Sequence, residues 1–113
     1  MARYLISFPS GAMDVPEEEM PEVARAAHAV VQEAKDAGVF IFGGGLEEAV
    51  APVMVAGDGT VTAGTYPETR ELSGGFTIVD VPSREAALQW AAKIAVACRC
   101  AQEVRELLPD PAV

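Results

Sequence analysis

The chain has 113 residues, of which half are hydrophobic and 22% are charged, and its formal net charge is −9 at pH 7. This length suits one domain with its own core and excludes two, and the composition lies far from that of disordered chains. The acidic balance argues against nucleic acid as a partner, because the eight Lys and Arg residues are scattered along the sequence without forming a basic patch.

The N-terminal stretch from Arg3 to Phe8 predicts a β-strand. Tyr4, Ile6 and Phe8 occupy alternate positions in it, as in a strand that turns one face to a core. The apolar run is too short for a signal peptide or a membrane span. We therefore expect a cytoplasmic protein that has no membrane as a partner.

The next segment predicts an amphipathic helix from about Pro21 to Gly38, preceded by a short turn. Proline suits the first position of a helix, and glycine suits the position just after its end. Apolar residues recur along one side at intervals of three and four. His28 falls on the flank of this stripe, between Val31 and Arg25, so its side chain can reach either the core edge or solvent.

A short apolar run, Val39 to Phe42, is typical of a buried strand. Gly43, Gly44 and Gly45 follow directly, and they indicate either a loop or a place where a backbone or a ligand approaches closely. They lack the G-x-G-x-x-G spacing and the following helix of a dinucleotide site. We regard Gly44 as a candidate ligand contact.

A β-hairpin is predicted after these glycines. Two runs of β-prone residues, at 52–56 and 60–63, flank a Gly-Asp-Gly turn whose residues tolerate positive φ angles. Residues 76–81, rich in apolar and β-branched side chains, predict a further strand.

Ser83 begins the second predicted helix, because its hydroxyl can cap the amides of a helix whose apolar face runs from Ala87 to Ala95. Trp90 lies at the margin of this face, where an indole can close the core or offer a surface to a ligand. Local propensity favours a helix over 102–108, continuing from Ala95, and this segment can also be written as a strand. Residues 109–113, which include two prolines, are expected to be irregular.

With the hairpin set aside and the tail taken as a strand, the order is strand, helix, strand, strand, helix, strand. This is the split βαβ arrangement of a ferredoxin-like α+β fold, an antiparallel sheet with two helices on one face and here an inserted β-hairpin. The other face would carry apolar residues such as Leu5, Phe40 and Phe42 without cover. A second copy of the chain is the obvious cover, so we expect a homodimer.

The stretch from Ala63 to Gly75 is a polar loop that leads into the strand at 76–81. Pro67 fixes its own φ angle and favours an extended conformation at Tyr66. Two glycines at the end of the loop let the backbone turn before the strand begins. The composition indicates a loop whose shape matters.

Residues 62–71, followed by Gly-Gly-Phe at 74–76, resemble the central motif of the YCII-related family, in its DGPF-type subgroup. Members usually read Asp-Gly-Pro-Phe, one further residue, Glu-Thr/Ser-Lys-Glu and then Gly-Gly-Phe, ahead of a strand that ends in an acid. Here the quartet from Ala63 to Tyr66 reads Ala-Gly-Thr-Tyr, and Arg70 replaces the lysine. The similarity extends from residue 4 to about residue 106. The matching residues are Gly64, Glu68, Thr69, Glu71, Gly74, Gly75, Phe76 and Asp80.

This resemblance implies one YCII-like domain over residues 1–113, a final strand around 102–107, and a dimer whose sheets pack face to face, as in dimeric α+β barrels. It also implies a role for His28, because YCII-type relatives pair a helix histidine with an aspartate for proton transfer at a cleft. Ala63 stands where the relatives carry an acid.

His28 is the only histidine, and histidine is the residue type whose ordinary pKa lies near neutrality, so acid-base chemistry by an imidazole must use it. We expect Glu68 to be the carboxylate nearest to it, ahead of Asp58 and Asp80, at the mouth of a cleft bordered by residues 64–71. A lone histidine on a helix flank can also be purely structural.

Two further side chains of the loop are candidate ligand contacts. Tyr66 can line a pocket with its ring or pack over the hairpin, and Arg70 can attract an anionic group. Glu68, Arg70 and Glu71 can equally form a solvated loop held by exposed ion pairs, which contribute little to stability.

Cys98 and Cys100 are the only cysteines, and with one histidine they cannot complete a tetrahedral zinc site within one chain. The sequence also lacks a P-loop and a Ser-His-Asp set. We expect reduced thiols, no bound metal and no cofactor.

Two functions from different classes fit these observations. The first is a small dimeric module that binds a small molecule or a partner protein in a cleft between sheet and helix. The second is a cofactor-independent enzyme of the isomerase or lyase type, in which His28 and Glu68 move a proton on a small anionic or aromatic molecule. Ala63 favours the first, because it removes one acid partner of the histidine.

Overall fold

The computed structural model describes residues 1–70 and 72–113. Its elements follow the predicted order, with short 3-10 helices in the connections. In chain order they are β1 (Ala2–Phe8), η1 (Ser10–Ala12), η2 (Glu17–Glu19), α1 (Met20–Asp36), β2 (Phe40–Gly45), β3 (Val53–Val55), β4 (Val61–Ala63), η3 (Pro67–Thr69), β5 (Gly75–Val81), α2 (Arg84–Cys98) and β6 (Glu103–Glu106).

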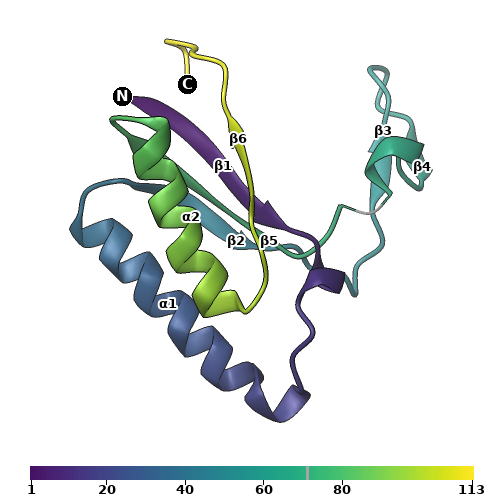
Figure 1. The fold of residues 1–113 in the computed structure, drawn as a ribbon. Helices are drawn as coiled ribbons and strands as arrows, with labels where there is room; N and C mark the ends of the chain where they lie inside the picture. Colours follow the sequence, from purple (N-terminus) through teal and green to yellow (C-terminus); the bar gives the residue numbers. More distant parts are fainter. Residues whose placement is uncertain (71) are drawn as a thin grey trace.

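Four strands form the main sheet in the order β2-β5-β1-β6, and each neighbouring pair is antiparallel. Helices α1 and α2 lie side by side over one face of this sheet (Figure 1). The arrangement is the ferredoxin-like α+β fold that the sequence predicts. Strands β3 and β4 form a separate hairpin, which stands off one end of the sheet.

The tail is a strand, because β6 pairs with β1 at the edge of the sheet. The hydroxyl of Tyr4 donates a hydrogen bond to Glu106 Oε1 at 3.2 Å, which ties the two strands through side chains as well as backbone. Residues 107–113 contain no helix or strand. Within the part of the chain that the structure describes, neither α-helix has the length and apolar character needed to cross a bilayer.

The core lies between the sheet and the helices. Tyr4 and Ile6 point from β1 toward the helices, and their partners Val79 and Val81 on β5 are also buried. Small side chains on α2, such as Ala87, let that helix pack closely on these residues. The alternation read in residues 3–8 therefore corresponds to the burial observed.

The opposite face of the sheet has no cover within the described chain. The register places Leu5, Ile78, Phe42 and Phe76 on this face, with the two phenylalanine rings 6.0 Å apart. Phe42 remains 61% exposed. This apolar patch, which we call the open face, is the feature predicted from the sequence.

Phe40 does not belong to the open face, and that expectation was wrong. A bulge between Phe40 and Phe42 inserts one extra residue into β2, so the two rings project from opposite faces of the sheet. Phe40 faces the helices, where Lys35 Nζ lies 5.5 Å from its ring centroid.

The ends of both helices have clear causes. Helix α1 begins with a proline in its first turn, and Gly38, at φ +75°, follows its last turn. Helix α2 begins after Ser83, whose Oγ accepts a hydrogen bond from the backbone N–H of Ala86 at 3.1 Å. Both observations confirm the predicted boundaries to within two residues.

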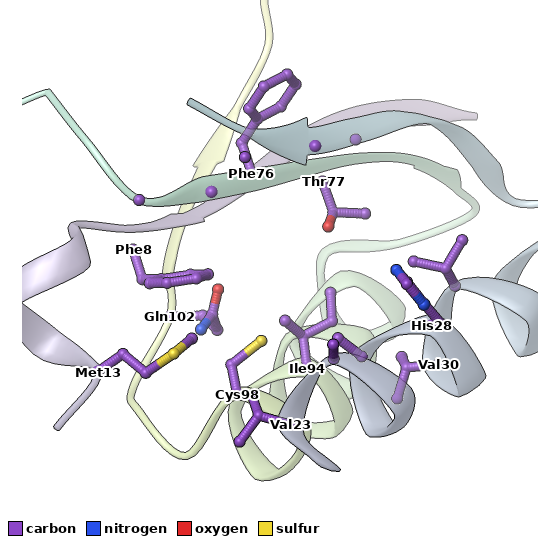
Figure 2. A pocket seen from close by; sticks show the side chains of 18 of the residues that line it. Phe8, Met13, Val23, His28, Val30, Phe76, Thr77, Ile94, Cys98 and Gln102 are labelled. Carbon is purple, nitrogen blue, oxygen red and sulfur yellow. The ribbon is translucent and has the colours of Figure 1, made fainter. Parts of the chain in front are cut away.

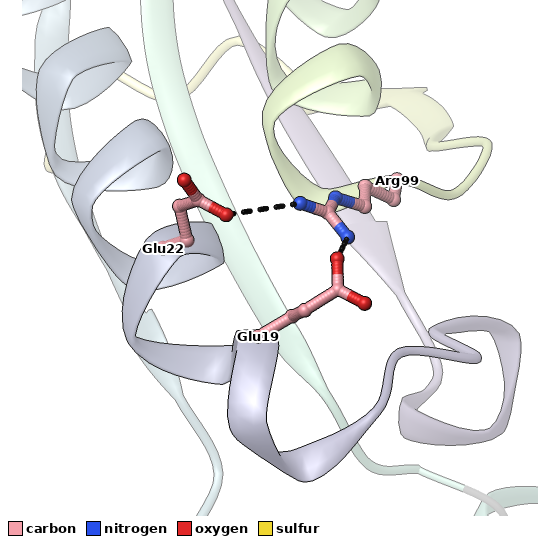
Figure 3. Close-up of polar contacts among 3 residues, drawn as sticks. All are labelled: Glu19, Glu22 and Arg99. Carbon is pink, nitrogen blue, oxygen red and sulfur yellow. Dashed lines mark hydrogen bonds and ion pairs between the residues drawn. The ribbon is translucent and has the colours of Figure 1, made fainter.

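Arg99 joins the end of α2 to the beginning of α1. Its guanidinium lies 2.6 Å from a carboxylate oxygen of Glu19 and 3.8 Å from one of Glu22 (Figure 3). A second ion pair, between Lys93 and Glu33 at 3.1 Å, links the helices further along. Such exposed pairs each contribute little to stability.

Gly74 is the glycine that the fold requires most strictly. It has φ +77°, and a Cβ at this position would overlap the carbonyl oxygen of Phe8 and the backbone of Pro9. Gly59, in the hairpin turn, also has a positive φ of +90° but is surrounded by open space.

We predict that Gly74→Ala lowers the free energy of unfolding by about 3 kcal/mol or more, because a backbone clash adds to the ~1–2 kcal/mol cost of positive φ.

Gly59→Ala is the matched control and should lose only the conformational part, about 1–2 kcal/mol. Urea unfolding followed by circular dichroism measures both values. Equal losses for the two variants would contradict the close approach of the chain at Gly74.

Candidate functional site

A cavity of about 790 Å³ lies between the sheet and the helices, at the end of the sheet where the hairpin is attached. Figure 2 shows side chains from the sheet, from α1 and from the end of α2 around a common space. A volume of this size is typical of small-molecule sites.

Missing side chains on the sheet create this cavity. Gly43, Gly45 and Gly75 occupy positions that face the helices, because Gly43 pairs with Thr77 and Gly45 pairs with Gly75 in the same register. No side chain from these three positions fills the space below α1. The three glycines of β2 are thus part of a strand, and Gly43 packs so closely that a Cβ would come within 2.8 Å of the carbonyl oxygen of Phe76.

The walls of the cavity are mostly apolar. Helix α1 contributes small and branched side chains, which leave more room than larger residues would. Phe8 and Phe40 close the space from the sheet. The apolar side chains from the helices are Met20, Val23, Ala24, Ala27, Val30, Val31 and Ile94.

Two polar side chains project into this apolar space from opposite walls. The imidazole of His28 projects from α1 and the hydroxyl of Thr77 projects from β5 toward the same part of the cavity (Figure 2). His28 is exposed, in agreement with its predicted place on the helix flank. Lys35, about two turns further along α1, adds a positive charge to the lining of the cavity.

A hydrogen-bonded cluster lies at the opposite end of the cavity, where the hairpin segment leaves the sheet. The hydroxyl of Ser10 donates to Glu48 Oε1 at 2.8 Å, and the backbone N–H of Ser10 donates to Ser73 Oγ at 3.1 Å. Ser10 and Glu48 both line the cavity. The cluster therefore holds a carboxylate beside the apolar space, and it joins three segments that are distant in sequence.

The inner end of the cavity carries sulfur and amide groups. Cys98 is buried, and its sulfur points into the cavity beside Gln102 (Figure 2). Burial raises the pKa of the Cys98 thiol, and the nearby Cys100 raises it further. Burial also raises the pKa of Cys100, while a hydrogen bond from Gln102 acts in the opposite direction. Both thiols are free in this structure.

The residues predicted from the sequence are only partly brought together. His28 and Gly44 line the cavity. Tyr66, Glu68 and Arg70 are exposed and do not line it, because they lie on or beside η3 in the segment that stands off the sheet. The carboxylate that lines the cavity is Glu48, so within one chain the expected border of the cleft at residues 64–70 is not observed.

The other acids considered as partners of the histidine have different neighbours. Asp58 accepts a hydrogen bond from the backbone N–H of Thr60 in the hairpin turn. Asp80 lies in β5, with its Oδ2 3.7 Å from Arg3 Nε. Glu71, the last acid of the motif, lies outside the described residues.

Sequence reasoning missed Ser10, Glu48 and Thr77. The register of residues 76–81 contained a usable signal, because a threonine two positions from a buried valine must share its face of the strand. Ser10 and Glu48 lie in connections, where no periodicity exists to reveal which way a side chain points. Among residues 1–70 and 72–113, no three His, Cys, Asp or Glu side chains gather as metal ligands would.

The model of the YCII-related domain matches residues 5–109 of this chain. The chain belongs to the YCII-related family. Comparison with curated protein sequences returned no match. The resemblance seen in the motif at residues 62–76 therefore extends over nearly the whole chain.

One solved structure similar to this YCII-related protein is the 5-chloro-2-hydroxyhydroquinone dehydrochlorinase (TftG) from Burkholderia phenoliruptrix, in complex with 2,5-dihydroxybenzoquinone. The two chains share 16% sequence identity, the match covers 97% of each, and the TM-score is 0.54. At this identity the similarity establishes the fold.

The raised pKa values of the cysteines predict slow reaction with thiol reagents. A thiol with a raised pKa has little thiolate at neutral pH, and the thiolate is the reactive species. We expect Cys98 and Cys100 to be alkylated by iodoacetamide much more slowly at pH 7 than the same thiols in urea, and their rates to level off at a higher pH than in urea, because their pKa values are raised. Mass spectrometry with time measures this, and a native thiol that reacts at pH 7 as fast as the unfolded chain would contradict it.

Proposed function

We propose that this YCII-related protein is a small homodimeric module that binds a small ring-shaped molecule with polar groups at its ends in the cavity beside His28. The observation that carries this proposal is the glycine floor of the cavity, at Gly43, Gly45 and Gly75. A core without function gains stability from filling such a space with side chains. This chain instead leaves about 790 Å³ open and places polar groups at its ends.

The polar groups indicate what kind of molecule would fit. His28 and Thr77 can donate or accept hydrogen bonds at one end, and Glu48 can accept them at the other. The walls between them are apolar, which suits the faces of a ring. A flat ring with hydroxyl or carbonyl groups at opposite ends satisfies this pattern, and the compound bound in the TftG structure, 2,5-dihydroxybenzoquinone, is of that kind.

The dimer is part of the proposal because the open face needs cover. Leu5, Phe42, Phe76 and Ile78 form an apolar patch on a sheet whose helices all lie on the other side. In a two-fold dimer the same patch of each copy packs against that of the other. Packing one open face on the other removes both from water.

A second candidate function is catalysis without a cofactor, of the isomerase or lyase type. The exposed position of His28 on the cavity wall favours it, since an imidazole there can take a proton from a bound molecule and return it elsewhere. Thr77 across the cavity and Glu48 at its other end could hold the molecule during the transfer. In this chain, Glu68 could take part only through movement or through another subunit.

Two variants test the binding site, with 2,5-dihydroxybenzoquinone as the probe. We predict that Gly45→Val abolishes binding, because the valine side chain fills the cavity. The melting temperature should not change, because a Cβ at this position comes no closer than 3.7 Å to another atom and valine favours strands. His28→Ala should weaken binding by about tenfold, a loss of about one hydrogen bond, and should leave folding intact because the side chain is exposed.

Arg25→Ala is the control for the histidine variant, since Arg25 lies on the same helix but does not line the cavity. Isothermal calorimetry and thermal melts measure the two quantities. Binding that Gly45→Val leaves unchanged would exclude the cavity as the site. A large loss of melting temperature in His28→Ala would instead assign the histidine a structural role.

Turnover of the same probe tests the second candidate. An enzyme of the proposed type would exchange ring hydrogens of the bound compound for solvent deuterium, because proton transfer at carbon is the chemistry assigned to His28. NMR in deuterated water follows this exchange. Exchange that exceeds the buffer rate and is lost in His28→Gln supports catalysis, whereas binding without exchange leaves a binding module.

A further inference from the structure

The segment between β2 and β5 forms an arm (residues 46–70) that stands away from the main sheet (Figure 1). Its hairpin strands β3 and β4 pair with each other and belong to no larger sheet. Each strand has three residues. A two-stranded hairpin is marginally stable in water and normally needs a packed face to persist.

One face of this hairpin is apolar and uncovered. The register pairs Val53 with Ala63 and Val55 with Val61, so these four side chains share a face. The three valines are 57%, 65% and 61% exposed in the order 53, 55, 61. Val-rich faces of this kind are normally buried against another layer.

The total surface of the chain indicates how much is left uncovered. The accessible area is 7823 Å², whereas a compact monomer of this mass exposes roughly 5,900 Å². The radius of gyration is 15.7 Å, compared with about 13 Å for a compact chain of this length. The excess of about 1,900 Å² is more than twice the ~800 Å² that each partner buries in a standard interface.

The open face of the sheet accounts for only part of this excess. With strands ~4.8 Å apart and ~3.3 Å per residue, four short strands present a flat footprint of about 400 Å². The arm carries a second apolar surface, and it adjoins the first. It begins just after Gly45 and its chain returns to the sheet at Gly75, while Phe76 and its partner position Gly44 lie at that same end of the open face.

We propose that the arm packs its valine face against a second copy of this chain, so that the arm and the open face form one continuous dimer interface. This inference rests on the proposed dimer and adds a second surface to it. The valine face carries no charge, which suits burial against an apolar surface of another copy rather than pairing with a charged ligand. The positions Tyr66, Glu68 and Arg70, on the same arm, are then carried to the partner.

Three variants test the arm by sedimentation velocity across a concentration series. Val55→Asp combined with Val61→Asp places charge on the valine face, Phe42→Asp places it on the open face, and Val96→Asp is the control on α2, where the valine is 81% exposed. All of these side chains are exposed in the protomer, so circular dichroism should show intact folding. We expect the arm variant and the open-face variant each to weaken the dimer about tenfold or more, and the control to match the wild type.

The outcomes separate the arm from the dimer itself. A wild-type protein that sediments as a monomer at micromolar concentration would overturn both. A dimer that Phe42→Asp dissociates and that the arm variant leaves unchanged would overturn the arm alone. Weakening by both variants, without weakening by Val96→Asp, supports the inference.

Hydrogen exchange gives a second measurement that does not depend on charge in the arm. In the Phe42→Asp monomer the amides of residues 53–63 should exchange faster than in the wild-type dimer, because the hairpin loses its cover. Equal protection in the two states would overturn the proposal.

Discussion

A four-stranded sheet with helices on one side only is the constraint from which the other features follow. The helices rest on Tyr4 and Val79 at one end of the sheet, where large side chains meet them. At the other end the sheet offers glycines, and the same helices leave a space instead of a core. The uncovered side retains its apolar residues. The cavity and the open face are thus two results of one incomplete layer.

The chemistry available in the cavity follows from the separate origins of its polar groups. His28 comes from a helix, Thr77 from a central strand, and Glu48 from a connection held by Ser10. These groups come from three different elements, so the backbone fixes their relative positions. Under the proposed function, a bound molecule would bridge them, and the site would select for the length and shape of that molecule more than for its charge. A protein with a net charge of −9 gains nothing from general attraction of anions.

The elements that depend on local signals were predicted correctly from the sequence. The predictions failed where the pairing of distant strands determines the structure. The alternation in residues 3–8 and the cap at Ser83 act within a few residues, and both were read correctly. Gly43 to Gly45 have low strand propensity, yet pairing with β5 extends the strand through them. The bulge before Phe42 leaves no mark in the sequence, so the face of Phe40 was assigned wrongly. The position of Glu68 depended on where a long insertion points, which no periodicity encodes.

Arg99 combines an unfavourable backbone conformation with a tertiary contact between the two helices. It is the non-glycine residue with positive φ, +57°, among those described, at a helix end where glycine has no steric cost. The arginine accepts that cost, and its side chain reaches the acids at the start of α1. The turn that directs the chain into β6 is therefore also the latch between the helices. A relative with glycine at this position would keep the turn and lose the ion pairs between the helices. Whether a relative carries arginine or glycine here would therefore indicate whether it retains this contact between α1 and α2.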